Sequence, residues 1–292
     1  MRPAEQVEGN VDRITRGVLV TGCGALTTVL TALALAWLDL RYDAAIYSFV
    51  YGFVLPFGAF FSGLVAASGY LFGARLFNYR PGWGQLAAIL VLSGGTFFLI
   101  YWLEYSFVTV DGIPLRALAS FGRYLVFELT HTALDVGPVS EKPVQLGLMG
   151  YAYAALQIVG FALGGLCIWL WLRASAYCKA CGLYMKKQGA QTRYYERIDE
   201  MNLCRAGFQA EAGAGAFRRA VQRHAQSGSR QAGATAGYAL NIAFLRCGQC
   251  GQQWLELTGR QRTNKVWSLM KGVRYSAYCT ERIDAIERLA GA

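Results

Sequence analysis

Four long stretches without a charged side chain constrain this chain more than any other feature. Residues 17–38, 44–74, 84–103 and 146–172 form runs of 22, 31, 20 and 27 residues that contain no Asp, Glu, Lys or Arg. A helix needs about 20 apolar residues to cross the hydrocarbon core of a bilayer. The runs therefore predict an α-helical integral membrane protein with four transmembrane helices, at about 17–38, 44–74, 84–105 and 146–172.

The composition agrees with a membrane protein. Only 16% of the 292 residues are charged and 54% are hydrophobic, whereas soluble globular chains carry about 25% charged residues. The N-terminal residues 1–16 do not resemble a signal peptide, because Glu5, Glu8 and Asp12 interrupt the positive region and the apolar run that follows is too long. We expect a short cytosolic segment and a membrane domain over residues 17–173.

The second apolar run is too long for a straight crossing. Pro56 lies in its first third and removes a helical hydrogen bond, which favours one kinked or tilted span. Two short re-entrant halves are the alternative, and they would place the C-terminal part of the chain on the opposite side of the membrane.

Charge is distributed unevenly along the chain, and this predicts an orientation. Residues 1–172 contain 9 basic and 10 acidic residues, whereas residues 173–292 contain 19 basic and 8 acidic residues, a net charge of +11. The loop at 75–83 adds two arginines and no acid. The positive-inside rule then places both termini in the cytoplasm, as in a bacterial inner-membrane protein, and residues 106–145 outside.

Small residues recur at helical spacing within the predicted spans. Gly69 and Gly73 form one such pair, and Gly160 and Gly164 form another. Rows of this kind allow close helix contact, either within one subunit or in a homo-oligomer.

The external loop is predicted to contain a surface helix at 116–136. Tyr124, Glu128, His131 and Asp135 fall on one face of it. Glu128 and His131 also form E-x-x-H, a spacing that can place two ligands on one metal. Carboxylate-bridged metal sites need two such motifs, so a polar surface face is the favoured interpretation.

Two cysteine pairs follow the last apolar run. Cys178 and Cys181 precede Gly182, and Cys247 and Cys250 precede Gly251. A C-x-x-C-G turn directs both sulfurs toward one ion, and glycine permits the positive φ that the turn requires. Four thiolates from two such turns form a tetrahedral Zn²⁺ site. A reduced cytoplasmic location argues against disulfides, so we predict structural zinc bound by the four cysteines.

At these two motifs the chain resembles a zinc ribbon, in which two such turns are carried on β-hairpins. The resemblance covers residues 177–187 and 239–278 and implies a small β-rich domain within residues 174–292. It departs in spacing, because 65 residues separate Cys181 from Cys247 rather than about 15–20. We expect an insertion at 188–238, helical at first and then a Gly/Ala/Ser/Gln-rich linker, and a short amphipathic helix at 280–291. A redox role for the first pair is the alternative, and it needs a strand-to-helix junction.

The motifs say less about function. No nucleophile–base pair, phosphate-binding loop or catalytic carboxylate pair is apparent, which favours a non-enzymatic protein. We expect scaffolding, sensing or docking of a cytosolic protein partner. One alternative is an oligomeric pore or transport protein that the zinc domain gates or assembles. A second is a membrane-tethered nucleic-acid binder, which the basic C-terminal part suggests.

Overall fold

The computed structural model describes residues 3–42, 45–48, 56–131, 133–134, 144–145, 147–233 and 235–279. The chain divides into two compact units, Met1–Ser175 and Ala176–Ala292. We call them the membrane unit and the sheet unit. The helix expected at 280–291 lies outside the described residues.

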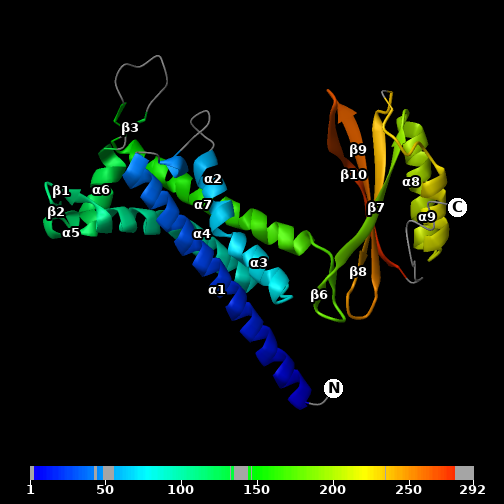
Figure 1. Cartoon of the computed structure of the whole chain (residues 1–292), viewed down its shortest axis with the longest axis horizontal. Coiled ribbons are helices and arrows are strands. Elements are labelled where there is room, and N and C mark those ends of the chain that lie inside the picture. Colours follow the sequence, from blue (N-terminus) through cyan, green and yellow to red (C-terminus); the bar gives the residue numbers. More distant parts are fainter. Residues whose placement is uncertain are drawn as a thin grey trace. The chain divides into compact units, whose positions relative to one another are not determined.

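The membrane unit contains four long helical segments (Figure 1). They are α1 (Pro3–Tyr42), α2 (Phe57–Ala66) followed by α3 (Ser68–Leu76), α4 (Trp83–Phe107) and α7 (Met149–Ala174). Four helical stretches are long and apolar enough to cross a membrane, namely Asp12–Tyr42, Phe57–Leu76, Trp83–Phe107 and Met149–Ala174. The prediction of four helices that are long and apolar enough to cross a membrane is therefore confirmed.

The second span begins later than predicted. Pro56 precedes α2 as its N-cap residue and does not kink a longer helix. Proline lacks an N–H group, which is tolerated where a helix starts because that N–H would have no helical partner. Between α1 and Pro56, the described residues are Ala45 and the short 3₁₀ helix η1 (Ile46–Ser48).

The irregularity in this span lies instead at Ala67, between α2 and α3. Thr27 of α1 bridges the break: its hydroxyl donates to the Ala66 carbonyl (2.7 Å) and accepts from the Gly69 N–H (3.1 Å). A side chain from a neighbouring helix thus satisfies buried backbone groups that the break in the helix would otherwise leave without a partner.

Small residues mediate the close contacts between these helices. A methyl group added at Gly63 would overlap the backbone of Phe161 in α7, and one at Gly164 would overlap the backbone of Leu64 in α2. Gly69 lies equally close to the backbone of Cys23 in α1. The predicted glycine rows therefore serve contacts within one subunit.

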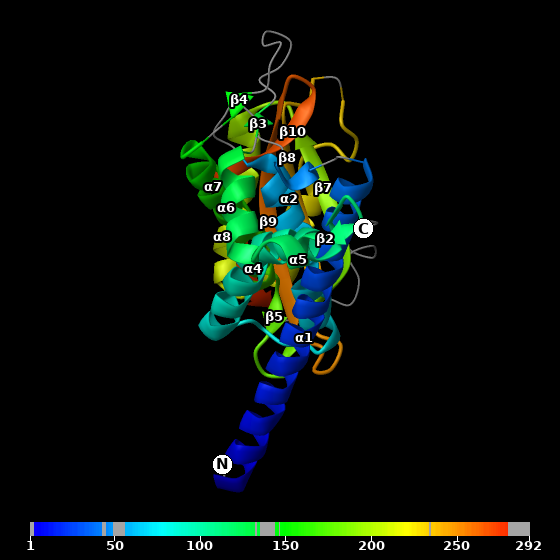
Figure 2. The same ribbon diagram turned by 90° about the vertical axis from the view of Figure 1, so that its left-hand side faces the viewer.

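The segments between α4 and α7 lie at one end of the membrane unit, and this end faces the viewer in Figure 2. They comprise β1 (Thr109–Val110), β2 (Ile113–Pro114), α5 (Leu115–Leu118), α6 (Phe121–His131), β3 (Ala133–Leu134) and β4 (Val144–Gln145). The helix predicted at 116–136 is divided, because Ala119 is extended and the Ser120 carbonyl starts α6 by accepting from the Tyr124 N–H. Tyr124 and Leu129 are buried in the core of the unit.

The sheet unit is built on a four-stranded antiparallel sheet in the order β10-β9-β8-β7. Its strands are β7 (Lys186–Tyr195), β8 (Tyr238–Arg246), β9 (Gln253–Thr263) and β10 (Val266–Cys279). A small hairpin of β5 (Tyr177–Cys178) and β6 (Leu183–Tyr184) precedes it. The strands expected on both sides of Cys247 and Cys250 are present as β8 and β9.

Two helices pack on one face of this sheet, α8 (Ile198–Gly213) and α9 (Phe217–Gln226) (Figure 1). The second helix occupies part of the stretch that its composition predicted to be a linker. Phe217, Ala220, Val221 and His224 are buried on one side of α9, at the i, i+3, i+4, i+7 spacing of an amphipathic helix.

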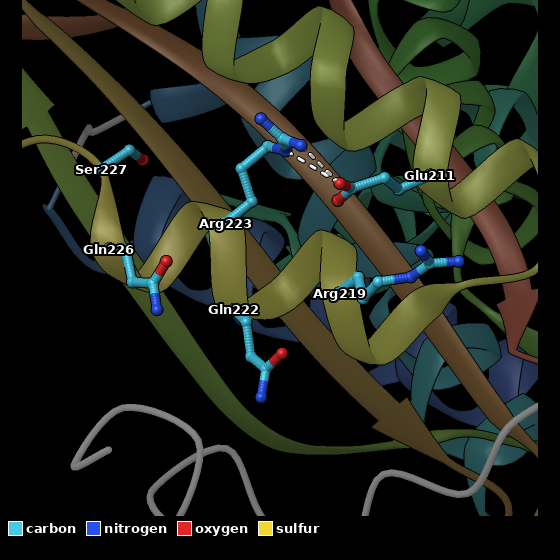
Figure 3. Close-up of a pocket in the computed structure, with 6 residues that line it drawn as sticks. All are labelled: Glu211, Arg219, Gln222, Arg223, Gln226 and Ser227. Atoms are coloured by element: carbon cyan, nitrogen blue, oxygen red, sulfur yellow. Dashed lines mark hydrogen bonds and ion pairs between the residues drawn. The ribbon is translucent and has the colours of Figure 1, made fainter.

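Polar contacts attach α9 to its neighbours. On its outer side, Arg223 Nη2 lies 2.6 Å from Glu211 Oε1 of α8 (Figure 3). On its inner side, the buried His224 donates from Nε2 to the Leu240 carbonyl of β8 (3.0 Å). The insertion is thus part of the folded unit.

Candidate metal centre

The two cysteine pairs come together at one end of the sheet. The sulfurs of Cys178, Cys181, Cys247 and Cys250 all lie within 4.8 Å of one another. Cys178 Sγ is 3.7 Å from Cys250 Sγ, far too long for a disulfide bond of about 2.05 Å. A tetrahedron of sulfurs around zinc, with Zn–S distances of about 2.3 Å, has edges of about 3.8 Å. The four thiols can therefore hold a metal ion.

The two turns repeat one geometry. Cys178 ends β5, and the Gly182 N–H donates to its carbonyl (2.9 Å). Cys247 follows β8, and the Gly251 N–H donates to its carbonyl (3.2 Å). Both glycines have positive φ, +66° and +72°, where an L side chain is strained. This is why the sequence pattern C-x-x-C-G indicated the turn correctly.

Backbone N–H groups point at the first sulfur of each turn. Burial opposes ionisation of Cys247, but hydrogen bonds from the N–H groups of Cys250 and Gln249, together with those from the thiols of Cys250 and Cys178, outweigh it and lower the pKa of Cys247 to about 7. Burial raises the pKa of Cys178 despite similar hydrogen bonds from Cys181 and Ala180. A cation that binds the four sulfurs must displace the remaining protons, so its affinity rises with pH.

The burial of the four cysteines is uneven. Cys178 and Cys247 are fully buried, Cys181 is partly exposed and Cys250 is exposed. The inner pair packs with Met185, beside the partly buried side chains of Leu183, Leu245, Trp254 and Tyr278. An ion would thus lie between a small apolar core and the solvent.

Two aromatic residues that the sequence motifs did not single out support this end of the sheet. Trp254 and Tyr278 form an edge-to-face pair with centroids 4.5 Å apart, and the Tyr278 hydroxyl donates to the Tyr177 carbonyl (3.2 Å). Their signal in the sequence is alternation along β9 and β10, because both lie on the face away from α8 and α9.

No protein-family model, curated protein or solved structure matches this chain. What the site can do therefore rests on its own geometry. The sheet with its two packed helices is larger than the zinc ribbon that the motifs resemble.

The structure also bears on the alternatives considered for these residues. The first pair joins the two strands of the β5–β6 hairpin, not a strand and a helix, so the context of a thioredoxin-like redox motif is missing there. Cys204 lies in α8, where its sulfur is 3.1 Å from Ser227 Oγ, and it is not one of the four clustered thiols.

Glu128 and His131 do not form a second metal cluster among the described residues. His131 Nδ1 lies 3.0 Å from the Phe127 carbonyl and its ring stacks on Phe127. Burial and the negative charge of Asp39 raise the pKa of Glu128. Asp135, predicted on the same face, lies outside the described residues.

Proposed function

We propose that this chain is a non-enzymatic membrane protein whose sheet unit is stabilised by one structural Zn²⁺ bound to Cys178, Cys181, Cys247 and Cys250. The convergence of four thiols within 4.8 Å carries the proposal. Structural zinc sites are typically closed by four protein ligands, whereas catalytic sites keep a position open for water or substrate. An all-sulfur set also favours zinc over the harder cations Mg²⁺ and Ca²⁺.

The role that fits this arrangement is presentation of a folded domain at a membrane, for scaffolding, sensing or docking of a cytosolic partner. The positive-inside rule supports a bacterial inner membrane with both termini in the cytoplasm, where thiols remain reduced. Reaction of an introduced Asp111→Cys with an impermeant thiol reagent, added to right-side-out vesicles, tests this orientation. Protection of that cysteine would contradict it.

The metal is tested by elemental analysis of the purified full-length protein. We expect one zinc per chain in the wild type and almost none in a Cys247→Ser/Cys250→Ser variant. Cys167→Ser, in α7 of the membrane unit, is the matched control and should keep its zinc. Zinc that remains bound in the double variant, or a wild type that contains no zinc after purification without chelators, would disprove the proposal.

A further inference from the structure

The sheet of the sheet unit has two chemically different faces. Along β8 and β9, Leu240, Ile242, Leu255 and Leu257 point toward α8 and α9 and are buried. Because side chains alternate along a strand, their neighbours point to the other side. We call this other side the open face. Beyond the end occupied by the cysteines it carries Thr192, Tyr194, Asn241, Thr258, Arg260, Arg262, Trp267 and Arg274.

Two aromatic rings meet on the open face although their strands are the two edges of the sheet. The ring centroids of Tyr194 in β7 and Trp267 in β10 are 5.6 Å apart, with planes at 55°. Strands in a sheet are about 4.8 Å apart, so edge strands of a flat four-stranded sheet could not bring these rings together. The β9–β10 hairpin therefore curls over the open face.

The curl has a local cause. The pairing of β9 and β10 shifts register between Leu269 and Arg274, and Gly272 within this interval has φ +77°. Such a bulge bends a strand and increases its twist. The Arg262 N–H also donates to the Gly237 carbonyl (2.8 Å), which holds the curled hairpin to the segment before β8. Both aromatic rings remain partly exposed.

The hairpin is strongly basic. The β9–β10 hairpin, residues 253–279, contains one acidic side chain, Glu256, and five basic ones, namely Arg260, Arg262, Lys265, Lys271 and Arg274. Arg260 is exposed and lies in the same cross-strand row as Ala239 and Leu269. The Arg274 side chain is 62% exposed and pairs with Glu256 at 2.7 Å. Arg260 thus lies in the cross-strand row of Tyr194, and Arg262 pairs with Trp267, on a face that also offers hydroxyl and amide groups.

We propose that the open face binds single-stranded nucleic acid. Unpaired bases stack on exposed aromatic rings, and arginines on a sheet pair with phosphates. Thr192 and Asn241, which already share a hydrogen bond (3.0 Å), add polar groups beside this path. A duplex buries its base faces in its own stack, so the aromatic pair favours a single strand. This inference goes beyond the proposed zinc function and concerns the other end of the same sheet.

The test uses the full-length protein in nanodiscs of neutral lipid, and fluorescence anisotropy with a labelled poly(dT) strand of about 15 nucleotides. We expect binding that weakens with salt. Trp267→Ala should weaken it about tenfold, because one stacked base is lost, whereas Trp267→Phe should stay within about threefold of the wild type. Equal zinc content in all variants shows that the sheet unit is intact.

Two variants that lose the same charge distinguish binding at the open face from general electrostatic attraction between the basic protein and the nucleic acid. Arg260→Gln on the open face and Arg219→Gln on α9 remove the same charge from exposed positions, and only the first should weaken binding and reduce its salt dependence. Equal losses in both variants would overturn the proposal, as would duplex binding as tight as single-strand binding. The proposal would also be overturned if the protein did not bind the strand but was captured by vesicles of anionic lipid in a Trp267-dependent way. That result would assign the open face to membrane docking.

Discussion

Both units bury apolar side chains, but they differ in what they expose and in where they bury small polar groups. In the membrane unit Ser93 and Thr96 of α4 are fully buried while Val91, two residues earlier, is 72% exposed. In the sheet unit Leu240 and Leu255 are fully buried, and the exposed positions of the neighbouring strands are mostly charged or polar. The apolar solvent of a bilayer removes the hydrophobic driving force between helices, so close backbone contact stabilises one unit and apolar burial the other. The comparison predicts that each unit can be damaged by changes that leave the other intact.

The largest expected effect is loss of the proposed zinc ion. Apparent binding free energies of structural zinc are about 10 kcal/mol or more, and they contribute to folding. Chelation of the wild type should expose the segment around Cys178, which we would detect as rapid tryptic cleavage at the exposed Lys179. The membrane unit has no part in the site, so its thermal unfolding in detergent should not change. If chelation also lowered the thermal stability of the membrane unit, the two units would be energetically coupled, contrary to this prediction.

The second effect is confined to the membrane unit. Gly63→Leu forces a side chain into the backbone of Phe161 and should lower the free energy of unfolding by about 3 kcal/mol or more. Gly95→Leu in α4 is the control, because a methyl group there meets nothing within 4 Å. Denaturation by SDS measures both variants, and zinc content reports the sheet unit. Equal stability of the two variants would contradict the close α2–α7 contact.

The third effect is a pH dependence confined to the sheet unit. Burial, together with the positive charge of Arg193, lowers the pKa of His224 to about 4, whereas an unfolded histidine titrates near about 6.5. Between these values the unfolded state binds more protons, so stability is full above pH ~6.5 and falls by roughly 2–3 kcal/mol as the pH drops toward ~4.

Thermal unfolding of the zinc-loaded protein across this pH range measures the effect. His224→Gln should flatten the pH dependence of the sheet unit, whereas His131→Gln, at an exposed position, should not. Acid release of the proposed zinc should be the same in both variants, so the difference between the slopes of their pH dependence isolates His224. Identical slopes would place the titration elsewhere.

Features determined by local chemistry could be predicted from the sequence. The four candidate spans follow from the length of apolar runs, which the thickness of a bilayer sets. The thiol cluster follows from two C-x-x-C-G turns, because Gly182 and Gly251 supply the positive φ that each turn needs. In both cases a few neighbouring residues carry the whole signal.

Features that depend on distant residues were missed. From the sequence, a helix that starts after Pro56 could not be distinguished from a longer helix that is kinked there. The break at Ala67 is tolerated because Thr27, some 40 positions earlier, forms hydrogen bonds with the backbone on both sides of it. The helix α9 does have a local signal, since Phe217, Ala220 and Val221 follow helical spacing. The surrounding Gly, Ala and Gln obscured it. The curl of the β9–β10 hairpin, which brings the rings of Tyr194 and Trp267 together, arises from a β-bulge that no local sequence pattern indicated.

The separation of the two cysteine pairs in the sequence has a consequence for synthesis of the protein. Cys181 leaves the ribosome 66 residues before Cys247, and Cys178 leaves it 69 residues before. Strand β7 must likewise wait for its partner β8, which follows both helices in the chain. At about 5–20 residues per second, the first pair waits roughly 3–13 s for the second. During that interval the nascent chain presents a half-site of two thiols. We expect metal to be captured firmly only once β8 has emerged, so closure of the site coincides with closure of the sheet.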